Sequence, residues 1–204
     1  MASRLASPAR MSAEQRREQL LDVTKAIVAE HGFHAVSIEA VAREAGITRP
    51  VVYGHFHDLA GLLEALIERE SQRALVQLAQ VLPRDFGKGD PAATLLAALR
   101  GYLEAVRSDP ATWQLVLMPP EGAPKMLHDH ITGGRDAVIA QLAAAMGPGF
   151  GSGDEPPDPE LAARMLSAFA DEAARLMLTD PERYPVERIL AQAKWALSQV
   201  GSGR

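Results

Sequence analysis

Residues 37–56, which read SIEAVAREAGITRPVVYGHF, constrain the fold of this chain more than any other stretch. Ser37 is a favourable N-cap, because its side-chain oxygen can accept a hydrogen bond from a backbone N–H of the first helical turn. The apolar residues that follow recur at helical spacing and predict one buried stripe: Ile38, Val41, Ala42 and Ala45. Gly46 then stands where a residue in the left-handed conformation ends a helix, a position that glycine occupies without a Cβ penalty.

A second short helix is predicted directly after this turn. Ile47 is apolar and is expected to pack inward, and Thr48 can cap the helix. Pro50 falls in the first helical turn, where a missing backbone N–H costs nothing. Two short helices joined by a glycine-containing turn form a helix-turn-helix, whose second helix has the size to enter the major groove of DNA.

Residues 19–66 carry several short pieces in a characteristic order and spacing: His31-Gly32-Phe33 at the end of an apolar helix, Ser37-Ile38, Ala45-Gly46-Ile47-Thr48, Val52-Tyr53-Gly54-His55-Phe56 and Leu62-Leu63. Together they resemble the DNA-binding end of the TetR family of bacterial repressors. One position departs from that family's pattern, because Leu59 stands where a lysine is usual three residues after the motif's phenylalanine. The departure bears on one phosphate contact and leaves the expected fold unchanged.

The composition and the helix-start signals predict an all-α fold. Hydrophobic residues make up 47% of the chain and aromatic residues only 5%, and helix-favouring Ala and Leu recur throughout. Ser12 with Gln15 forms a capping-box pattern that opens the first helix, and Asp58 can cap a long helix that reaches Leu82. Four Asp-Pro pairs mark further helix starts, the last of them opening only a single turn: Asp90-Pro91, Asp109-Pro110, Asp158-Pro159 and Asp180-Pro181.

The helices of the second half are predicted near the following residues: 91–107, 110–118, 124–146, 159–179 and 186–199. The total of about nine helices resembles the TetR architecture along the whole chain. We therefore expect a three-helix helix-turn-helix DNA-binding domain at 1–57, with 1–11 as a flexible arm, and a helical ligand-binding and dimerisation domain at 58–204. The Gly- and Pro-rich stretch at 147–157 is expected to be poorly ordered.

The distribution of charge supports this division. The net charge is −5, but residues 1–57 carry seven Lys or Arg against six Asp or Glu, which gives +1. The remaining residues therefore carry 14 against 20, or −6. A near-neutral head on an acidic body suits a protein that meets phosphates at one end only.

The resemblance implies a homodimer whose two recognition helices enter successive major grooves of a pseudo-palindromic operator. Arg49 is the candidate for direct readout, because its planar fork matches the two acceptors on the guanine edge. Pro50 and Val51 can contact a thymine methyl group. Candidates for phosphate contacts are Ser37, Thr48, Tyr53 and His55, together with Arg43, which can equally be solvated. The alternative for Tyr53 and His55 is packing against the first helix.

The resemblance also implies a small-molecule pocket in the second half and dimerisation through the last two helices. Alanine is frequent at 159–179, and small side chains let helices approach closely, as a four-helix dimer seam requires. Pocket candidates are large adaptable or aromatic residues, each of which can instead be plain core: Tyr102, Trp113, Leu117, Met118, Met126, His130, Met165 and Phe169. An acidic residue of Asp171-Glu172, beside Arg175, can face the pocket as an acceptor or form an ordinary ion pair.

Several classes of protein are disfavoured by the sequence. The absence of cysteine excludes disulfides and thiolate metal sites. His128 and His130 point about 200° apart on a helix, so no metal site is expected there. The sequence shows neither a signal peptide nor an apolar run of membrane-spanning length, so a cytoplasmic protein is expected. No glycine-rich phosphate loop or nucleophile elbow is present, and neither an enzyme activity nor a cofactor is expected.

The sequence thus predicts a TetR-type DNA-binding regulator. Repression is the default that the resemblance implies, with release of the operator caused by a small, largely apolar ligand. The nearer alternative is a TetR-type DNA-binding protein without a small-molecule effector. A helical-bundle enzyme is the distant alternative.

Overall fold

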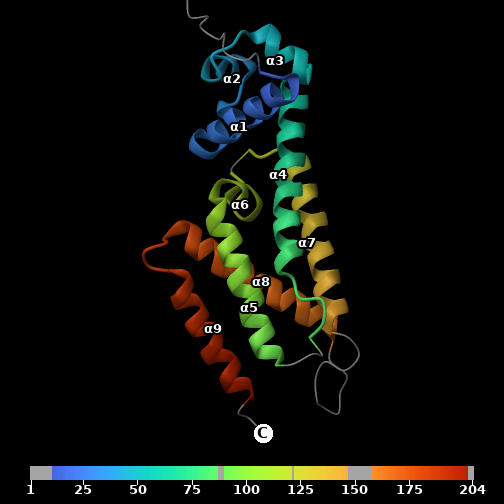
Figure 1. The fold of residues 1–204 in the computed structure, drawn as a ribbon, viewed down its shortest axis with the longest axis vertical. Helices are drawn as coiled ribbons and strands as arrows, with labels where there is room; N and C mark the ends of the chain where they lie inside the picture. The colour runs from blue at the N-terminus through green and yellow to red at the C-terminus, as the bar shows by residue number, and fades with distance from the viewer. Residues whose placement is uncertain (1–10, 87–89, 121, 147–157, 202–204) are drawn as a thin grey trace, which may run out of the picture. The chain divides into compact units, whose positions relative to one another are not determined.

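The computed structural model describes residues 11–86, 90–120, 122–146 and 158–201 of the chain. Within these residues the protein forms nine α-helices and one short 3-10 turn, and no strand (Figure 1). The all-α fold class expected from the sequence is therefore confirmed. The N-terminal arm with Arg4 and Arg10, and the glycine-rich stretch at 147–157, lie outside the described residues.

The chain divides into two compact units, Met1–Leu66 and Ile67–Arg204, and the division falls inside one long helix. The first unit contains the following elements and the first eight residues of α4: α1 (Ala13–His31), η1 (Phe33–Ala35), α2 (Ile38–Glu44) and α3 (Arg49–Phe56). The second unit contains the rest of α4 (Leu59–Val81) and five further helices: α5 (Pro91–Ser108), α6 (Pro110–Leu117), α7 (Lys125–Met146), α8 (Pro159–Thr179) and α9 (Val186–Gly201).

The helix starts of the first unit are fixed by the capping residues that the sequence indicated. Ser12 and Gln15 form a complete capping box, with bonds of 2.9 and 3.1 Å between the side chain of each and the backbone N–H of the other. Ser37 accepts from the Ala40 N–H at 3.0 Å, and Asp58 accepts from the Gly61 N–H at 2.7 Å. Local side-chain chemistry therefore sets where α1, α2 and α4 begin.

The turn between α2 and α3 is built around Gly46, whose φ of +66° lies in the left-handed region. Thr48 precedes α3 in an extended conformation but makes no side-chain capping bond, so only its backbone performs the expected capping role. Val41 of α2 and Val52 of α3 are fully buried, as are Leu20 and Leu21 of α1. The helix-turn-helix is thus held by the apolar stripes that the sequence predicts.

The second unit starts its helices with the predicted Asp-Pro pairs. Asp90 accepts from the Ala92 N–H at 2.9 Å, and Asp158 accepts from the Leu161 N–H at 3.0 Å. Asp109 accepts from the Thr112 N–H at 3.4 Å. Asp180 accepts from the Arg183 N–H in a single turn, as expected. In each helix the proline stands at the first turn, where it gives up no hydrogen bond.

Two apolar clusters fill the second unit. The larger one surrounds Trp113 and Leu103 and draws residues from α4, α5, α6, α8 and α9. The smaller one packs Phe86 against Ile139 of α7 and Ala163 of α8. Helix α8 crosses the other helices of this unit and contributes to both clusters (Figure 1).

One buried acid fixes α6 to α4 within the second unit. Glu70 of α4 is only 2% exposed and accepts from the hydroxyl of Thr112 in α6. Its carboxylate also pairs with Arg69 at 2.8 Å and with Arg73 at 3.3 Å. Because a buried charge is tolerated only when it is paired and hydrogen-bonded, this group holds the two helices in one arrangement.

Two helical glycines of the second unit differ in what a methyl group would meet. A Cβ at Gly133 of α7 would meet nothing within 4 Å, whereas a Cβ at Gly101 of α5 would lie 2.8 Å from Cγ1 of Val81. We expect Gly133→Ala to raise the free energy of unfolding by about 0.5–1 kcal/mol, because alanine loses less backbone entropy than glycine in a helix.

Gly101→Ala raises helix propensity by the same amount but is expected to lower stability overall. The new methyl group would clash with the branched side chain of Val81, which can move away only if its helix moves. Urea unfolding of the two variants beside the wild type measures both changes. Equal stabilisation by the two substitutions would contradict the close packing of α5 on α4.

Candidate recognition helix and ligand cavity

Helix α3 turns its two apolar anchors inward and its candidate DNA-binding residues outward. Val52 and Phe56 are buried, and the guanidinium of Arg17 lies over the Phe56 ring at 5.0 Å. The predicted contact residues of this region are exposed, except for the half-buried His55: Ser37, Arg43, Thr48, Arg49, Pro50, Val51 and Tyr53. Tyr53 keeps 48% of its surface exposed and is not a core residue.

The polar side chains at and near the start of α3 make only weak or partial interactions within the protein. Arg49 lies 3.9 Å from Glu39, and both side chains are well exposed, so the pair contributes little. The Thr48 hydroxyl takes no part in capping. Ser37 uses its oxygen as an acceptor, which leaves its hydroxyl hydrogen free to donate. These side chains can therefore bind DNA with little loss of interactions inside the protein.

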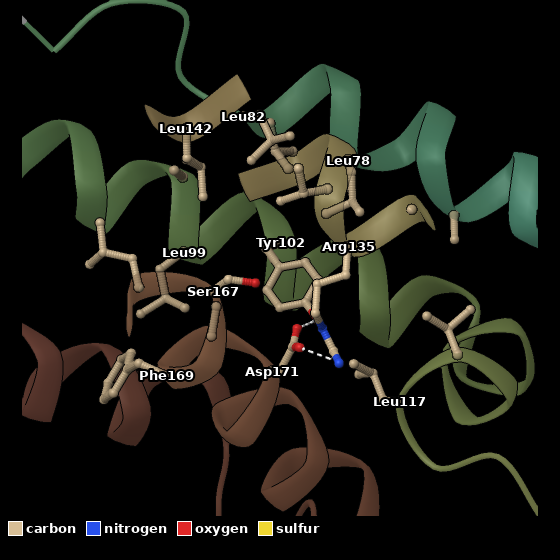
Figure 2. Close-up of a pocket in the computed structure, with 18 of the residues that line it drawn as sticks. Leu78, Leu82, Leu99, Tyr102, Leu117, Arg135, Leu142, Ser167, Phe169 and Asp171 are labelled. Carbon is tan, nitrogen blue, oxygen red and sulfur yellow. Dashed lines mark hydrogen bonds and ion pairs between the residues drawn. The ribbon is translucent and has the colours of Figure 1, made fainter. Parts of the chain in front are cut away.

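The second unit contains an apolar cavity of about 290 Å³ that is partly open to solvent (Figure 2). All six helices of this unit contribute lining residues, most of them leucine, valine or alanine. Five of the eight pocket candidates from the sequence lie in its wall: Tyr102, Trp113, Leu117, His130 and Phe169.

The three remaining candidates, all methionines, are not part of the wall. Met165 is 66% exposed on α8. Met118 accepts a weak hydrogen bond from Thr179 at 3.8 Å, and Met126 offers its backbone oxygen to His130. The composition signal that selected methionine does not specify which side of a helix faces the cavity, and here it selected three residues outside the lining.

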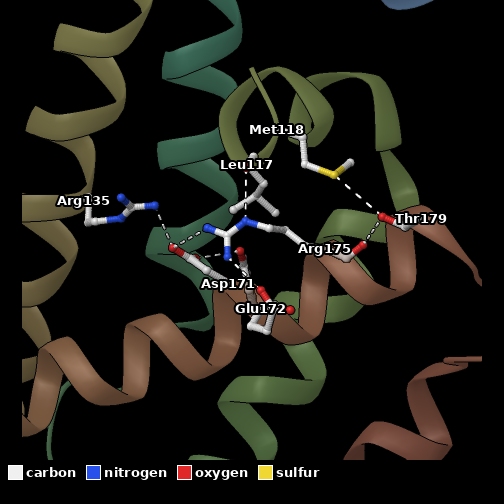
Figure 3. A network of polar contacts seen from close by, with 8 residues as sticks. Leu117, Met118, Arg135, Asp171, Glu172, Arg175 and Thr179 are labelled. Atoms are coloured by element: carbon white, nitrogen blue, oxygen red, sulfur yellow. Dashed lines mark hydrogen bonds and ion pairs between the residues drawn. The ribbon is translucent and has the colours of Figure 1, made fainter. Parts of the chain in front are cut away.

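A polar cluster closes one end of the cavity. Asp171 of α8 accepts from the Tyr102 hydroxyl of α5 at 3.2 Å and from Nη2 of Arg135 of α7 at 2.9 Å (Figure 2). Arg175 lies 4.0 Å from the same carboxylate and donates to the backbone oxygen of Leu117 at 3.2 Å (Figure 3). Asp171 therefore combines the two possibilities left open by the sequence, because it lines the cavity as an acceptor and also forms an ion pair.

Tyr102 is kept neutral by its surroundings. Burial raises the pKa of the Tyr102 hydroxyl well above its ordinary value, and the negative charge and hydrogen bond of Asp171 add to this effect. Its ring meets the Trp113 ring edge-on, with centroids 5.2 Å apart, and the Trp113 Nε1–H donates to Gln77 at 2.8 Å. The hydroxyl therefore acts as a hydrogen-bond donor at the polar end of the cavity.

Arg135 was missed by sequence reasoning. It follows Gly133-Gly134 on α7, where no apolar pattern marks the facing residues. Gly134 also lines the cavity, and a Cβ there would lie 3.5 Å from a Leu75 methyl of α4. The packing of α7 on α8, which the chain pattern does not specify, brings Arg135 to Asp171.

His130 borders the cavity and links α7 to α4. Its Nδ1 lies 3.0 Å from the Met126 carbonyl oxygen, and its Nε2 lies 2.9 Å from the Glu68 carboxylate. Because both partners are acceptors, the two ring nitrogens are best satisfied when both carry protons. The bond to Met126 raises the pKa of His130; partial burial opposes this rise, and the bond to Glu68 and its charge add to it.

Comparisons with known proteins agree with this geometry. Residues 20–66 match the family model for bacterial regulatory proteins of the tetR family. The uncharacterized HTH-type transcriptional regulator Rv1255c of Mycobacterium tuberculosis is 29% identical over 159 residues, covering 75% of this chain and 71% of that protein. The crystal structure of a TetR-like transcriptional regulator from Rhodococcus sp. RHA1 superposes with a TM-score of 0.68 at 22% identity, covering 97% and 100% of the two chains.

A further similar structure is the complex of SmeT with triclosan, at 25% identity and a TM-score of 0.67, covering 88% of this chain and 90% of that one. SmeT is the repressor of a multidrug efflux pump of Stenotrophomonas maltophilia. The fold and the exposed recognition helix define a helix-turn-helix DNA-binding regulator, and such proteins are not enzymes. Residues 20–66 form a DNA-binding domain of the tetR family of bacterial regulatory proteins, and the chain as a whole has the fold of TetR-like regulators. No helix among the described residues has the length and apolarity to cross a bilayer.

The two hydrogen bonds of the His130 ring lead to a prediction about how stability depends on pH. Because its pKa is raised in the folded protein, its contribution to the free energy of unfolding is fully present below the unfolded value of about 6.5. That contribution is lost as the pH rises through the folded-state pKa. We expect His130→Gln to remove this part of the pH dependence, measured by urea unfolding at several pH values.

His128→Gln is the matched control, because it removes an exposed histidine from the same helix. An NMR titration of the histidine ring protons should place the His130 midpoint above 6.5. A His130 midpoint at or below that value would contradict the assignment of its two acceptors.

Proposed function

We propose that this protein is a ligand-responsive repressor that binds a pseudo-palindromic operator as a homodimer and is released by a small, largely apolar molecule. The apolar cavity of about 290 Å³ is the observation that carries the proposal, because a unit serving only as a dimer or partner surface needs no such space. A solved structure of SmeT, a repressor of similar fold, is a complex with triclosan, which supports the same interpretation.

Residues 1–57 are proposed as the DNA-binding domain and 58–204 as the sensing and dimerisation domain of a cytoplasmic regulator. Arg49 is the proposed reader of a base edge, and Pro50 and Val51 are the proposed contacts to a thymine methyl group. Ser37, Arg43, Thr48, Tyr53 and His55 are proposed to position the protein on phosphates. Their exposure and weak internal bonding support these roles.

An exposed apolar stripe on α8 supports the homodimer. Leu161, Met165 and Phe169 stand four residues apart, so they lie along one side of the helix, and each is between 49% and 66% exposed. On α9, Trp195 is 59% exposed. Large apolar residues in a row on a helix surface mark an interaction site, and a second copy of the same stripe would cover them. We therefore propose Met165 as a seam residue.

Release follows from linkage between the two binding events. A ligand that fits the cavity better in the form unsuited to DNA lowers operator affinity, and DNA lowers ligand affinity by the same factor. The alternative, a DNA-binding protein without an effector, is favoured by a solid core, and the cavity counts against it. Selection of bound genomic fragments, followed by a search for compounds that release them, tests the proposal. Operator binding that no apolar compound reverses would overturn it.

The two arginines proposed to meet DNA should behave differently. Arg49→Ala is expected to cost about 1–3 kcal/mol at one base pair and to relax specificity there, because a bidentate contact to guanine is lost. Arg43→Ala is expected to weaken binding to all sequences alike and to reduce the salt slope by about one, because one phosphate contact is lost.

Fluorescence anisotropy with the selected operator and its single-base variants, at several salt concentrations, distinguishes the two effects. If Arg49→Ala left the ranking of the operator variants unchanged, Arg49 would not be the reader of a base edge.

The proposed seam predicts a change in oligomeric state. Met165→Asp places a charge in the middle of the stripe and is expected to shift the protein toward monomer, with at least a tenfold loss of operator affinity. Val76→Asp is the matched control, because Val76 is 49% exposed on α4, away from the stripe. Sedimentation velocity of both variants gives the oligomeric state. A dimer of unchanged strength in Met165→Asp would exclude the stripe as the seam.

A further inference from the structure

We propose that the cavity takes an amphipathic ligand with a single anionic head group, preferentially a carboxylate, bound by Arg135, and an apolar tail. This inference rests on the proposed function and specifies the chemical class of its ligand. It follows from three observations: the composition of the wall, the bonding of the polar cluster, and the exposure of Arg135.

Over most of its area, the wall of the cavity is complementary only to apolar groups of a ligand. Figure 2 shows Leu78 of α4, Leu82 just after it, Leu99 of α5 and Leu142 of α7 around the cavity. Val138 of α7 also lines it. A polar group placed among them would lose its hydration without gaining a hydrogen bond, which is costly. The part of the ligand that lies there is therefore a hydrocarbon.

The charged residues at the polar end of the cavity offer free donors rather than free acceptors. Both oxygens of Asp171 are engaged, one by the Tyr102 hydroxyl at 3.2 Å and the other by Arg135 at 2.9 Å. A guanidinium carries five N–H donors, and Arg135 uses one nitrogen for Asp171, its one bond to another described residue. An incoming head group at this end therefore meets unused donor capacity, which an acceptor satisfies.

The charge at this end favours an anion over a neutral or cationic head. Two guanidinium groups, Arg135 and Arg175, lie within 4.0 Å of the single Asp171 carboxylate, whereas Glu172, the second partner of Arg175, is 61% exposed. A cation would be repelled by both arginines, and bonds from a guanidinium to a charged acceptor are stronger than bonds to a neutral one. His130, the other ionisable cation of the wall, is already occupied by Glu68.

The position of Arg135 lowers the desolvation cost of binding an anionic head group. Its side chain is 43% exposed, so an anion bound there keeps part of its hydration while its tail extends into the leucine-lined part. Asp171 is only 16% exposed and acts as a positioning residue, because it holds the guanidinium at the cavity (Figure 2). The site thus has a solvent-exposed, charged end and an apolar end.

Three probes that differ only in the head group test the inference on the full chain: decanoate, 1-decanol and decylamine, titrated calorimetrically below their aggregation limits. Decanoate is expected to bind roughly fivefold to tenfold more tightly than decanol, and decylamine more weakly than either. Arg135→Gln should reduce the affinity for decanoate to that for decanol and leave the affinity for decanol unchanged.

Arg164→Gln is the matched control, because Arg164 is an exposed arginine of α8 that pairs with Glu160 and does not line the cavity. It should leave all three affinities unchanged. The comparison of probes on the wild-type chain decides the question even if Arg135→Gln fails to fold, which circular dichroism would show.

The outcomes separate the two proposals. Equal binding of decanoate and decanol, or tighter binding of decylamine, would overturn the anionic head group while leaving an apolar effector in place. Failure of all three probes would overturn the amphipathic class. The repressor function itself is judged by a different measurement, the release of operator by other apolar compounds.

Discussion

The organisation of the second unit depends on one carboxylate. Asp171 of α8 bonds to Tyr102 of α5 and to Arg135 of α7, so a single side chain ties three helices together at one end of the cavity. Apolar packing alone has no direction and would allow these helices to slide until the space between them closed. Directional bonds to a largely buried acid fix their spacing, and they leave a cavity whose wall is mostly apolar.

A second carboxylate fixes α6 to α4 in the same way. Glu70 of α4 accepts a hydrogen bond from Thr112 of α6 and pairs with two arginines of α4. Both acids would be costly if their partners were removed, so they restrict the unit to few arrangements. The glycines act in the opposite sense, by allowing close approach. Gly101 lets α5 contact Val81, and Gly134 lets α7 approach Leu75. Fixed polar contacts and small residues together determine where the helices touch and where they remain apart.

Most of the fold was predictable from the sequence because its signals are local. The capping residues Ser12, Ser37, Asp58 and Asp158 act within three residues of their own positions, and the helix starts that they predict are confirmed. The cavity was predictable only in part. Tyr102 and Trp113 stand in its wall, but Arg135 carries no local pattern, because its partner Asp171 lies 36 residues away in the chain. Outside the cavity, the contact between Glu70 and Thr112 also spans 42 residues. Three methionines were selected for their chemistry, but none stands in the wall. Met165 is exposed on α8, Met126 lies near the start of α7 and Met118 follows the end of α6.

The two tryptophans of the chain occupy contrasting environments, and this gives the protein two separate optical reporters. Trp113 is buried, lies edge-on to Tyr102 and stands in the cavity wall, so its emission should respond to an occupant of the cavity. Trp195 is largely exposed on α9, so its emission should shift to shorter wavelength when another surface covers it. Replacing either one by phenylalanine would isolate the signal of the other, so that filling of the interior and association of subunits could be followed independently in one sample.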